Sequence, residues 1–240
     1  MGKQRPCLAG MMAAVGIVAI YRGGLRPWMY TWGAGPEEVT GVLPGDELVL
    51  PDSPRTTRAL TIDAPVDAVW PWLAQIGEDR GGFYSYAMLE RAVGAHVYNA
   101  NRVHPEWQDL HVGDSIWLAR RYGDGARQTV ALVEPESDLV LMAPADFERV
   151  QRGEKASGAW SFHVRRIDGW TRLIVRGSGD MAGNPLFDIA HFVMERRMMC
   201  GIRHRAEQLY RDEPGGLPAN HLATLPATPH GNSALQAQPT

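Results

Sequence analysis

Polar and apolar residues alternate along short segments in the middle of the chain, a spacing typical of β-strands. The first of these segments covers residues 57–62 and is followed by Asp63. Further strands are predicted at 115–119, 128–134, 139–143, 159–167 and 170–176. Asp168-Gly169 separates the last two, and this dipeptide favours a two-residue β-hairpin because it tolerates a positive φ. The pattern therefore predicts an antiparallel sheet.

Apolar residues three or four apart predict helices in two other places. Pro65 suits the first turn of a helix that ends at Gly77, and Pro71 should kink it or break it in two, because an internal proline removes a hydrogen bond. A second amphipathic stretch covers residues 84–93. Asn184 should cap a long helix from Pro185 to about Tyr210.

The long helix carries an apolar face that needs a broad surface to pack against. Ile189, Phe192, Val193, Met199 and Ile202 recur on it at helical spacing. The antiparallel sheet is the surface available for this packing. The order of elements is thus strand, helices, strands and a long C-terminal helix.

The chain of 240 residues is 45% hydrophobic and 21% charged, which is ordinary for globular proteins and excludes a disordered, collagenous or polytopic membrane protein. Residues 1–30 form a basic and apolar N-terminal segment, and 31–54 are predicted to be a linker. The domain should cover 55–213. Residues 214–240 are rich in Pro, Gly, Ala and Asn and are predicted to be a disordered tail.

Residues 1–30 contain four basic residues and no acid, and an uncharged run from Cys7 to Tyr21 lies between the basic pairs. Such a run predicts a short membrane anchor, since 15 helical residues span only about 22 Å of a hydrocarbon core of about 30 Å. A cleaved signal peptide, and with it secretion, is less favoured because no small-x-small site precedes Arg22. A helix docked on the protein's own surface is the other alternative. We therefore expect a membrane-associated or cytoplasmic protein.

The net charge is −3, and the arginine pairs at 120/121, 165/166 and 196/197 are scattered along the sequence. This distribution argues against a nucleic-acid partner. Cys7 and Cys200 are the two cysteines, too few for a disulfide framework or a cysteine zinc site. Nothing in the charge pattern indicates an oligomeric state.

Several segments resemble the START-like SRPBCC superfamily, with its polyketide cyclase/dehydrase and lipid-transport branch. They are the sequence Thr-Ile-Asp-Ala-Pro-Val-Asp-Ala-Val-Trp at 61–70, Arg-Gly-Gly-Phe-Tyr-Ser-Tyr at 80–86, the turn at 112–114 and the helix around 198–207. A bacterial subgroup also carries an Arg-Pro-Trp segment like residues 26–28 after an apolar N-terminus.

The resemblance implies an α+β helix-grip fold, in which a curved antiparallel sheet packs on a long C-terminal helix around an internal cavity. It covers about residues 55–211. Members include lipid carriers and cyclases, so the resemblance implies no particular reaction, because function depends on the cavity and not on the fold.

Two patterns could carry cofactor or metal chemistry. Gly177, Gly179 and Gly183 imitate a dinucleotide-binding turn, but only a helix and a tail follow, so no βαβ unit can form and a flexible entrance to the long helix is preferred. His191 and Glu195 are four residues apart on one helix face, which is half of a metal site or a polar pair in the cavity. The loop histidines at 96, 104 and 111 supply no matching second half. We predict neither a metal nor a cofactor.

A hydrophobic ligand needs apolar walls and a few polar groups that fix its orientation. The candidates that combine these properties are Tyr84, Tyr86, Trp117, Trp160, Phe162, His191, Met194 and Met198. Ordinary core packing by the same aromatic and methionine side chains is an equal alternative. Ser85 lacks the surroundings of a catalytic nucleophile.

The leading hypothesis is binding, transport or sequestration of a hydrophobic small molecule or lipid between the sheet and the last helix. One alternative is a cyclase or dehydratase acting on a polyketide-like or aromatic substrate, with His191, Glu195, Tyr84 or Tyr86 moving protons. Another is a membrane-proximal interaction module without a small ligand. A second ionisable group within hydrogen-bond reach of His191 would favour the enzyme.

Overall fold

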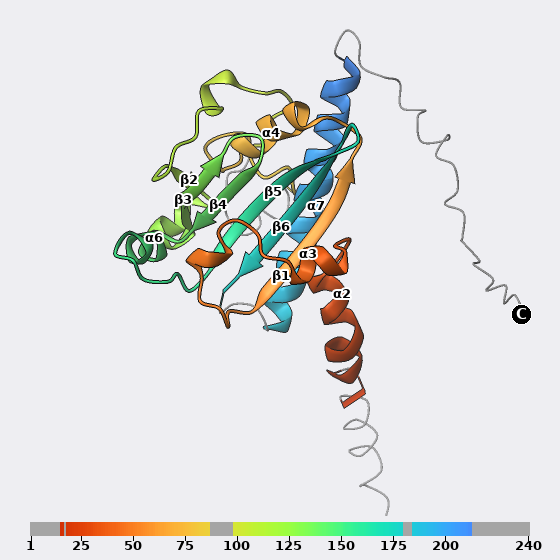
Figure 1. Ribbon diagram of the computed structural model, residues 1–240, viewed down its shortest axis with the longest axis vertical. Coiled ribbons are helices and arrows are strands. Elements are labelled where there is room, and N and C mark those ends of the chain that lie inside the picture. The colour runs from red at the N-terminus through yellow and green to blue at the C-terminus, as the bar shows by residue number, and fades with distance from the viewer. Residues whose placement is uncertain (1–14, 17, 87–97, 180–183, 213–240) are drawn as a thin grey trace, which may run out of the picture.

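The computed structural model describes residues 15–16, 18–86, 98–179 and 184–212 (Figure 1). One antiparallel sheet has the strand order β1-β6-β5-β4-β3-β2. Its strands are β1 (Arg55–Ile62), β2 (Ser115–Trp117), β3 (Arg127–Glu134), β4 (Asp138–Met142), β5 (Ala159–Ile167) and β6 (Trp170–Ser178). All six predicted strands are therefore confirmed.

The hairpin between β5 and β6 forms where the sequence predicted it. The register runs from Ile167 opposite Trp170 outward along both strands. Asp168 and Gly169 make the turn with φ values of 44° and 88°. Two successive positive φ angles match the right-handed twist of the strands, which is why Asp-Gly is favoured there.

The long helix α7 (Pro185–Asp212) runs along one face of the sheet (Figure 1). The Asn184 side chain caps it, because its Oδ1 accepts hydrogen bonds from the backbone N–H groups of Leu186 and Phe187 at 3.1 and 3.3 Å. Helix α4 (Val66–Ala74) lies beside α7 under the same sheet face. It is not divided at Pro71, and it ends three residues before Gly77.

Further helical segments surround this arrangement. They are the π-helix η1 (Tyr21–Leu25), α2 (Arg26–Tyr30), α3 (Pro36–Thr40), α6 (Pro144–Gln151), and the 3-10 helices η2 (Asp46–Leu48), η3 (Pro105–Trp107) and η4 (Arg120–Ala126). The sequence analysis did not predict α6. Most of the predicted amphipathic stretch 84–93, the tail from residue 213 and most of the run from Cys7 to Tyr21 lie outside the described residues.

The main core lies between the sheet and helices α4 and α7, where Leu73, Phe162 and Met199 are fully buried. A smaller apolar cluster that includes Val49 and Val140 covers the opposite, outer face of the sheet. Burying both faces removes apolar surface from water on both sides of the central strands. The sheet is therefore the middle layer of the molecule.

Residues 36–54, the larger part of the segment that the sequence predicts as a linker, lie on this outer face. Arg176 of β6 forms an ion pair with Asp46 and donates to the Glu38 carbonyl oxygen at 2.6 Å. Arg172 donates to both carboxylate oxygens of Glu38 at 2.7 and 2.8 Å. Outward-facing arginines of β6 hold the segment in place, because a bidentate guanidinium–carboxylate pair fixes geometry.

Gly201 marks the closest approach of α7 to the chain at Tyr84. A Cβ atom built there would lie 2.3 Å from the Tyr84 carbonyl oxygen, and Tyr84 itself has a φ of 55°. Gly201→Ala should lower the free energy of unfolding by about 1–3 kcal/mol, since overpacking against backbone outweighs the helix propensity gained. Urea unfolding followed by circular dichroism would measure this loss.

Gly125→Ala is the matched control, because a Cβ at Gly125 meets no atom within 4 Å. Its change should stay within about 0.5 kcal/mol, as for most surface substitutions. Equal stability of the two variants would contradict the tight contact.

Candidate functional site

A cavity of about 640 Å³ lies between the sheet and the first half of α7. Its walls are mainly apolar and come from β1, β5, β6, α7 and the chain around Phe83. Ligand pockets of drug-sized molecules span about 300–1,000 Å³ and are mostly apolar with a few polar groups. The space has the size and the chemistry of a small-molecule site.

One wall of this cavity holds a buried ion pair. Arg58 of β1 contacts Glu195 of α7 through Nη1 and Oε2, and both side chains are at most 1% exposed. The second oxygen of Glu195 accepts a hydrogen bond from Trp160 Nε1 at 2.8 Å. Arg58 Nε donates to the Met29 carbonyl oxygen at 2.7 Å, and its guanidinium lies over the Phe192 ring at 5.3 Å. Both carboxylate oxygens of Glu195 are therefore engaged.

His191 lies beside this pair at the cavity surface. Its Nδ1 is 3.3 Å from Arg58 Nη1, and its Nε2 is 3.7 Å from Glu195 Oε1. An arginine can only donate, so Nδ1 must be the acceptor in this contact and Nε2 carries the proton. The ring is stacked on Phe187, with 5.5 Å between the ring centres. His191 thus offers an N–H group at a mainly apolar wall.

Four of the eight predicted ligand-binding residues line the cavity. Trp160 comes from β5, and His191, Met194 and Met198 come from one face of α7. Ser85 also lines the cavity, and the Ser85 Oγ donates a hydrogen bond to the Met194 carbonyl oxygen at 3.1 Å. Whether these residues bind a ligand stays a prediction.

The other four do not line the cavity. Tyr84 is buried against Trp72, and its hydroxyl accepts a hydrogen bond from Gln75 Nε2 at 3.1 Å. Burial raises the pKa of the Tyr84 hydroxyl above its usual value. This residue packs between α4 and α7, where its ring contacts Trp72 and the Arg205 guanidinium, and it does not line the cavity.

The cavity wall also does not include Tyr86, Trp117 or Phe162. Tyr86 is 44% exposed and lies under the Arg197 guanidinium. Trp117 is at the far sheet edge, in cation–π contact with Arg120 and Arg127. Phe162 is fully buried behind Trp160, with ring centres 4.7 Å apart. Alternation along a strand gives the face of a residue but not its distance from a cavity.

Arg58 is the functional candidate that the sequence analysis missed. It lies in phase with the apolar residues Leu60 and Ile62 along β1, which places it on the core-facing side of the strand. A charge at such a position requires a buried partner, because an isolated charge in the interior costs several kcal/mol. The position of Arg58 in this alternation was therefore the signal in the sequence, although it does not show that Glu195 is the partner.

The glycines after β6 are part of the cavity wall. Gly177 and Gly179 line it, and a Cβ at Gly177 would lie 3.8 Å from the His191 ring. Gly183 lies outside the described residues. Among the described residues, α7 is the next element after β6 and no strand follows it. A dinucleotide-binding unit would require a parallel strand after the helix.

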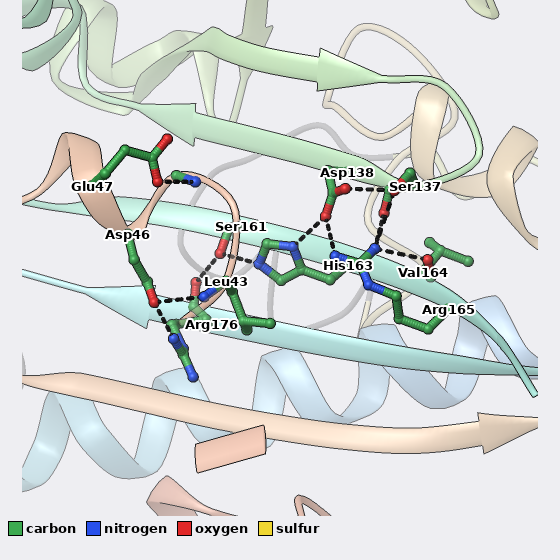
Figure 2. A network of polar contacts seen from close by, with 11 residues as sticks. Leu43, Asp46, Glu47, Ser137, Asp138, Ser161, His163, Val164, Arg165 and Arg176 are labelled. Carbon is green, nitrogen blue, oxygen red and sulfur yellow. Dashed lines mark hydrogen bonds and ion pairs between the residues drawn. The ribbon is translucent and has the colours of Figure 1, made fainter. Parts of the chain in front are cut away.

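A second polar network lies on the outer face of the sheet (Figure 2). His163 Nδ1 is 2.6 Å from Asp138 Oδ1, and its Nε2 is 2.9 Å from Ser161 Oγ. Arg165 also donates to Asp138 Oδ1 at 2.7 Å. The order of contacts imitates a serine–histidine–aspartate triad.

This network does not border the cavity, and Ser161, His163 and Asp138 are all buried. Gly45 of the outer segment approaches Val140, the residue opposite Ser161 in the sheet. A nucleophile needs room for a carbonyl substrate beside it. The network therefore ties β4 to β5 and is not a hydrolytic site.

Within the described ranges, no three His, Cys, Asp or Glu side chains gather as a metal site would require. His104 pairs with Glu106 and His111 with Asp109, near the surface. His96 lies outside these ranges.

No helix in the described part of the chain has the length and apolarity needed to cross a membrane.

No protein-family profile and no curated protein matches this chain. Solved structures do match it. A protein of Nitrosomonas europaea is 11% identical, with a TM-score of 0.41, over 65% of this chain and 95% of its own. The AHSA1-like protein of Aeromonas hydrophila is 14% identical, with a TM-score of 0.36, over 64% and 94%.

The Polyketide_cyc-like protein of Corynebacterium glutamicum is 14% identical, with a TM-score of 0.32, over 68% of this chain and 92% of its own. Similarity at this level says nothing about a ligand or a reaction. The fold is defined by the chain's own features, a six-stranded antiparallel sheet packed on a long C-terminal helix. By this architecture the chain has the helix-grip fold of the START-like SRPBCC proteins that its sequence resembles.

Proposed function

We propose that this protein binds a hydrophobic small molecule or lipid in the cavity between the sheet and α7. The observation that carries the proposal is the mainly apolar cavity of about 640 Å³ with one hydrogen-bonding wall. Apolar walls bind a ligand by removing its surface from water, worth about 25 cal/mol per Å². The His191 N–H supplies the directional contact that an oxygen atom of the ligand would accept.

The methionines of α7 support a ligand of variable shape. Met194 and Met198 line the cavity from one helix face. Thioether side chains are flexible and adapt to irregular apolar surfaces. Trp160 forms the rigid opposite wall, because its indole is fixed by the hydrogen bond to Glu195.

Filling the cavity tests this proposal. Met194→Trp in the full chain should weaken binding of the uncharged dye Nile red at least tenfold, because the larger side chain occupies the cavity. Gln208→Trp is the matched control, since Gln208 is exposed on the same helix and its variant should bind within about twofold of the natural protein. Fluorescence titration measures both affinities.

Native mass spectrometry with organic extraction of the full chain would identify a ligand that purifies with the protein. A folded Met194→Trp variant that binds Nile red as tightly as the natural protein would contradict the proposal. A protein that also carries no extracted compound would favour the interaction module.

A cyclase or dehydratase is the second candidate function, and the position of His191 favours it. Arg58 Nη1 lies 3.3 Å from His191 Nδ1, so an ionisable group is within hydrogen-bond reach of the histidine. In such an enzyme the Nε2–H group of His191 would donate a hydrogen bond to a substrate oxygen on which negative charge develops, and so stabilise that charge. Conversion of an extracted compound by the natural protein, and its loss in His191→Gln, would test this role.

A further inference from the structure

The first turns of α7 expose an apolar stripe. Leu186, Ile189 and Val193 are 81%, 41% and 38% exposed. Their spacing of three and four residues places them on one face of the helix, which points away from the sheet. The periodicity of the sequence predicted that Ile189 and Val193 would pack on the sheet, and the structure shows that this was wrong. Phe192, which the same periodicity includes, is buried.

The N-terminal helical segment lies beside this stripe. It leaves the body of the molecule at the end of the sheet where α7 begins (Figure 1). Trp28 of α2 packs edge-on against Phe192, with 5.1 Å between ring centres. Trp28, Leu25 and Ile20 are themselves largely exposed. The contact between Trp28 and Phe192 therefore places the exposed apolar side chains of the N-terminal segment next to α7.

A buried polar cluster fixes the two helices relative to each other. Asp188 of α7 accepts hydrogen bonds from the hydroxyls of Tyr21 and Tyr30 at 2.8 and 2.9 Å. Arg26 Nε lies 3.5 Å from the same carboxylate. Burial, together with the Asp188 carboxylate, raises the pKa of Tyr21 to about 12, so its hydroxyl stays a donor at neutral pH. The N-terminal segment is thus held at the start of α7.

Both parts of this surface are flanked by basic residues. Arg196 and Arg197 follow Val193 by one turn of α7 and are exposed. Arg22 is exposed and belongs to a stretch of thirty residues without any acid, although the whole chain has a net charge of −3. Apolar side chains next to arginines fit the interface of an anionic bilayer, where each basic residue contributes about 1 kcal/mol.

The cavity reaches the same surface. Phe187, in the first turn of α7, lines the cavity and is also 36% exposed, so it lies at the border between the cavity and the outside. It is adjacent in sequence to Leu186, the most exposed residue of the stripe. The two side chains belong to the same first turn of α7 but point about 100° apart around its axis, so a bilayer in contact with the stripe lies beside the turn that borders the cavity.

We propose that this surface docks on an anionic lipid bilayer and places the border of the cavity against it. We define the exposed apolar face by six residues, namely Ile20, Leu25, Trp28, Leu186, Ile189 and Val193. The docking stands on the surface alone, whereas uptake of the cavity ligand from the bilayer rests on the function proposed above. The contact is made by α7 as well as by the N-terminal segment.

A fluorescent label distinguishes α7 docking from attachment through the N-terminus alone. The full chain with Cys7→Ser and Cys200→Ser would carry an NBD label on Ile189→Cys. With vesicles of phosphatidylcholine and phosphatidylglycerol, its emission should shift to the blue and be quenched by lipids spin-labelled in their acyl chains. A label on Val112→Cys is the control, because Val112 is 54% exposed but lies in the turn before β2. It should remain unquenched.

Substitution of the stripe provides the second readout. Leu186→Glu with Val193→Glu should weaken partitioning to the anionic vesicles at least tenfold, and Val112→Glu should leave it within about twofold. Nile red binding without vesicles should be unchanged in the double variant, so failure of docking and failure of cavity binding are separable. An unquenched label at position 189 on vesicle-bound protein would overturn the proposal. The proposal would also be overturned if sedimentation equilibrium showed a dimer of the natural protein and a monomer of the double variant, with vesicle partitioning unaffected.

Discussion

Glu195→Leu should lower the free energy of unfolding by about 3–5 kcal/mol, because it leaves the buried Arg58 guanidinium without its counter-charge. Both side chains are at most 1% exposed, so water cannot replace the lost carboxylate. Arg58 Nη2 already has no hydrogen-bond partner among the described residues, and its remaining contacts are the Met29 carbonyl oxygen, His191 and the Phe192 ring. Urea unfolding of the full chain, followed by circular dichroism, measures the loss.

A double variant separates the burial of an unpaired charge from the loss of attraction. Arg58→Met combined with Glu195→Leu should recover most of the stability, since apolar side chains can replace a buried ion pair at little cost. Glu154→Leu is the matched control, because Glu154 pairs with Arg152 at the exposed surface and such pairs contribute about 0–1 kcal/mol. A double variant as unstable as Glu195→Leu would show that the charge is not the cause.

Asp138→Asn should lower the free energy of unfolding at pH 7 by about 2–4 kcal/mol, because charged hydrogen bonds from His163 and Arg165 are lost. Burial alone would raise the pKa of Asp138, but the hydrogen bonds of His163, Arg165 and Ser137 together hold it well below the usual range. The network joins β4 to β5 in the middle of the sheet (Figure 2). Its loss should therefore destabilise the whole domain.

The sign of the pH dependence follows from this lowered pKa. A carboxyl group whose pKa is lower in the folded than in the unfolded state stabilises the fold above its unfolded pKa of about 3.9. The stabilisation is lost as the pH falls from there toward the folded pKa. Between pH 6 and pH 3, the natural protein should therefore lose more stability than Asp138→Asn.

Asp109→Asn is the control for this experiment, since Asp109 is exposed and pairs only with His111 among the described contacts. It should keep both the stability and the pH profile of the natural protein. If Asp138→Asn had the natural profile below pH 4, the network would not account for acid sensitivity.

The cavity wall has two polar features, the Arg58–Glu195 ion pair and His191. The two differ because both carboxylate oxygens of Glu195 are engaged by Arg58 and Trp160, whereas His191 keeps an N–H group at the cavity surface. The ion pair links β1 to α7 and so stabilises the cavity wall. His191 is the group available to a ligand.

The sequence by itself determined the elements and their order. Alternation along β1, β5 and β6, the Asp168-Gly169 turn and the Asn184 cap act over a few residues, so they can be recognised without the tertiary structure. They also predicted that the long helix packs on the antiparallel sheet, as in a helix-grip fold, because each has an apolar face to bury. The resemblance at residues 61–70 and 80–86 implied the same fold.

Only the tertiary structure decided which residues share the cavity. Phe162 and Trp160 both point toward α7, yet only Trp160 reaches the space, since Phe162 packs behind it. Arg58 and Glu195 are 137 positions apart, and no local pattern connects them. Likewise, Ile189 fits the helical periodicity of a buried face but is exposed, because the face of α7 that packs inward carries Asp188, Phe192 and Glu195 instead. Contacts between distant segments depend on how the layers pack, and that packing is fixed by the whole chain at once.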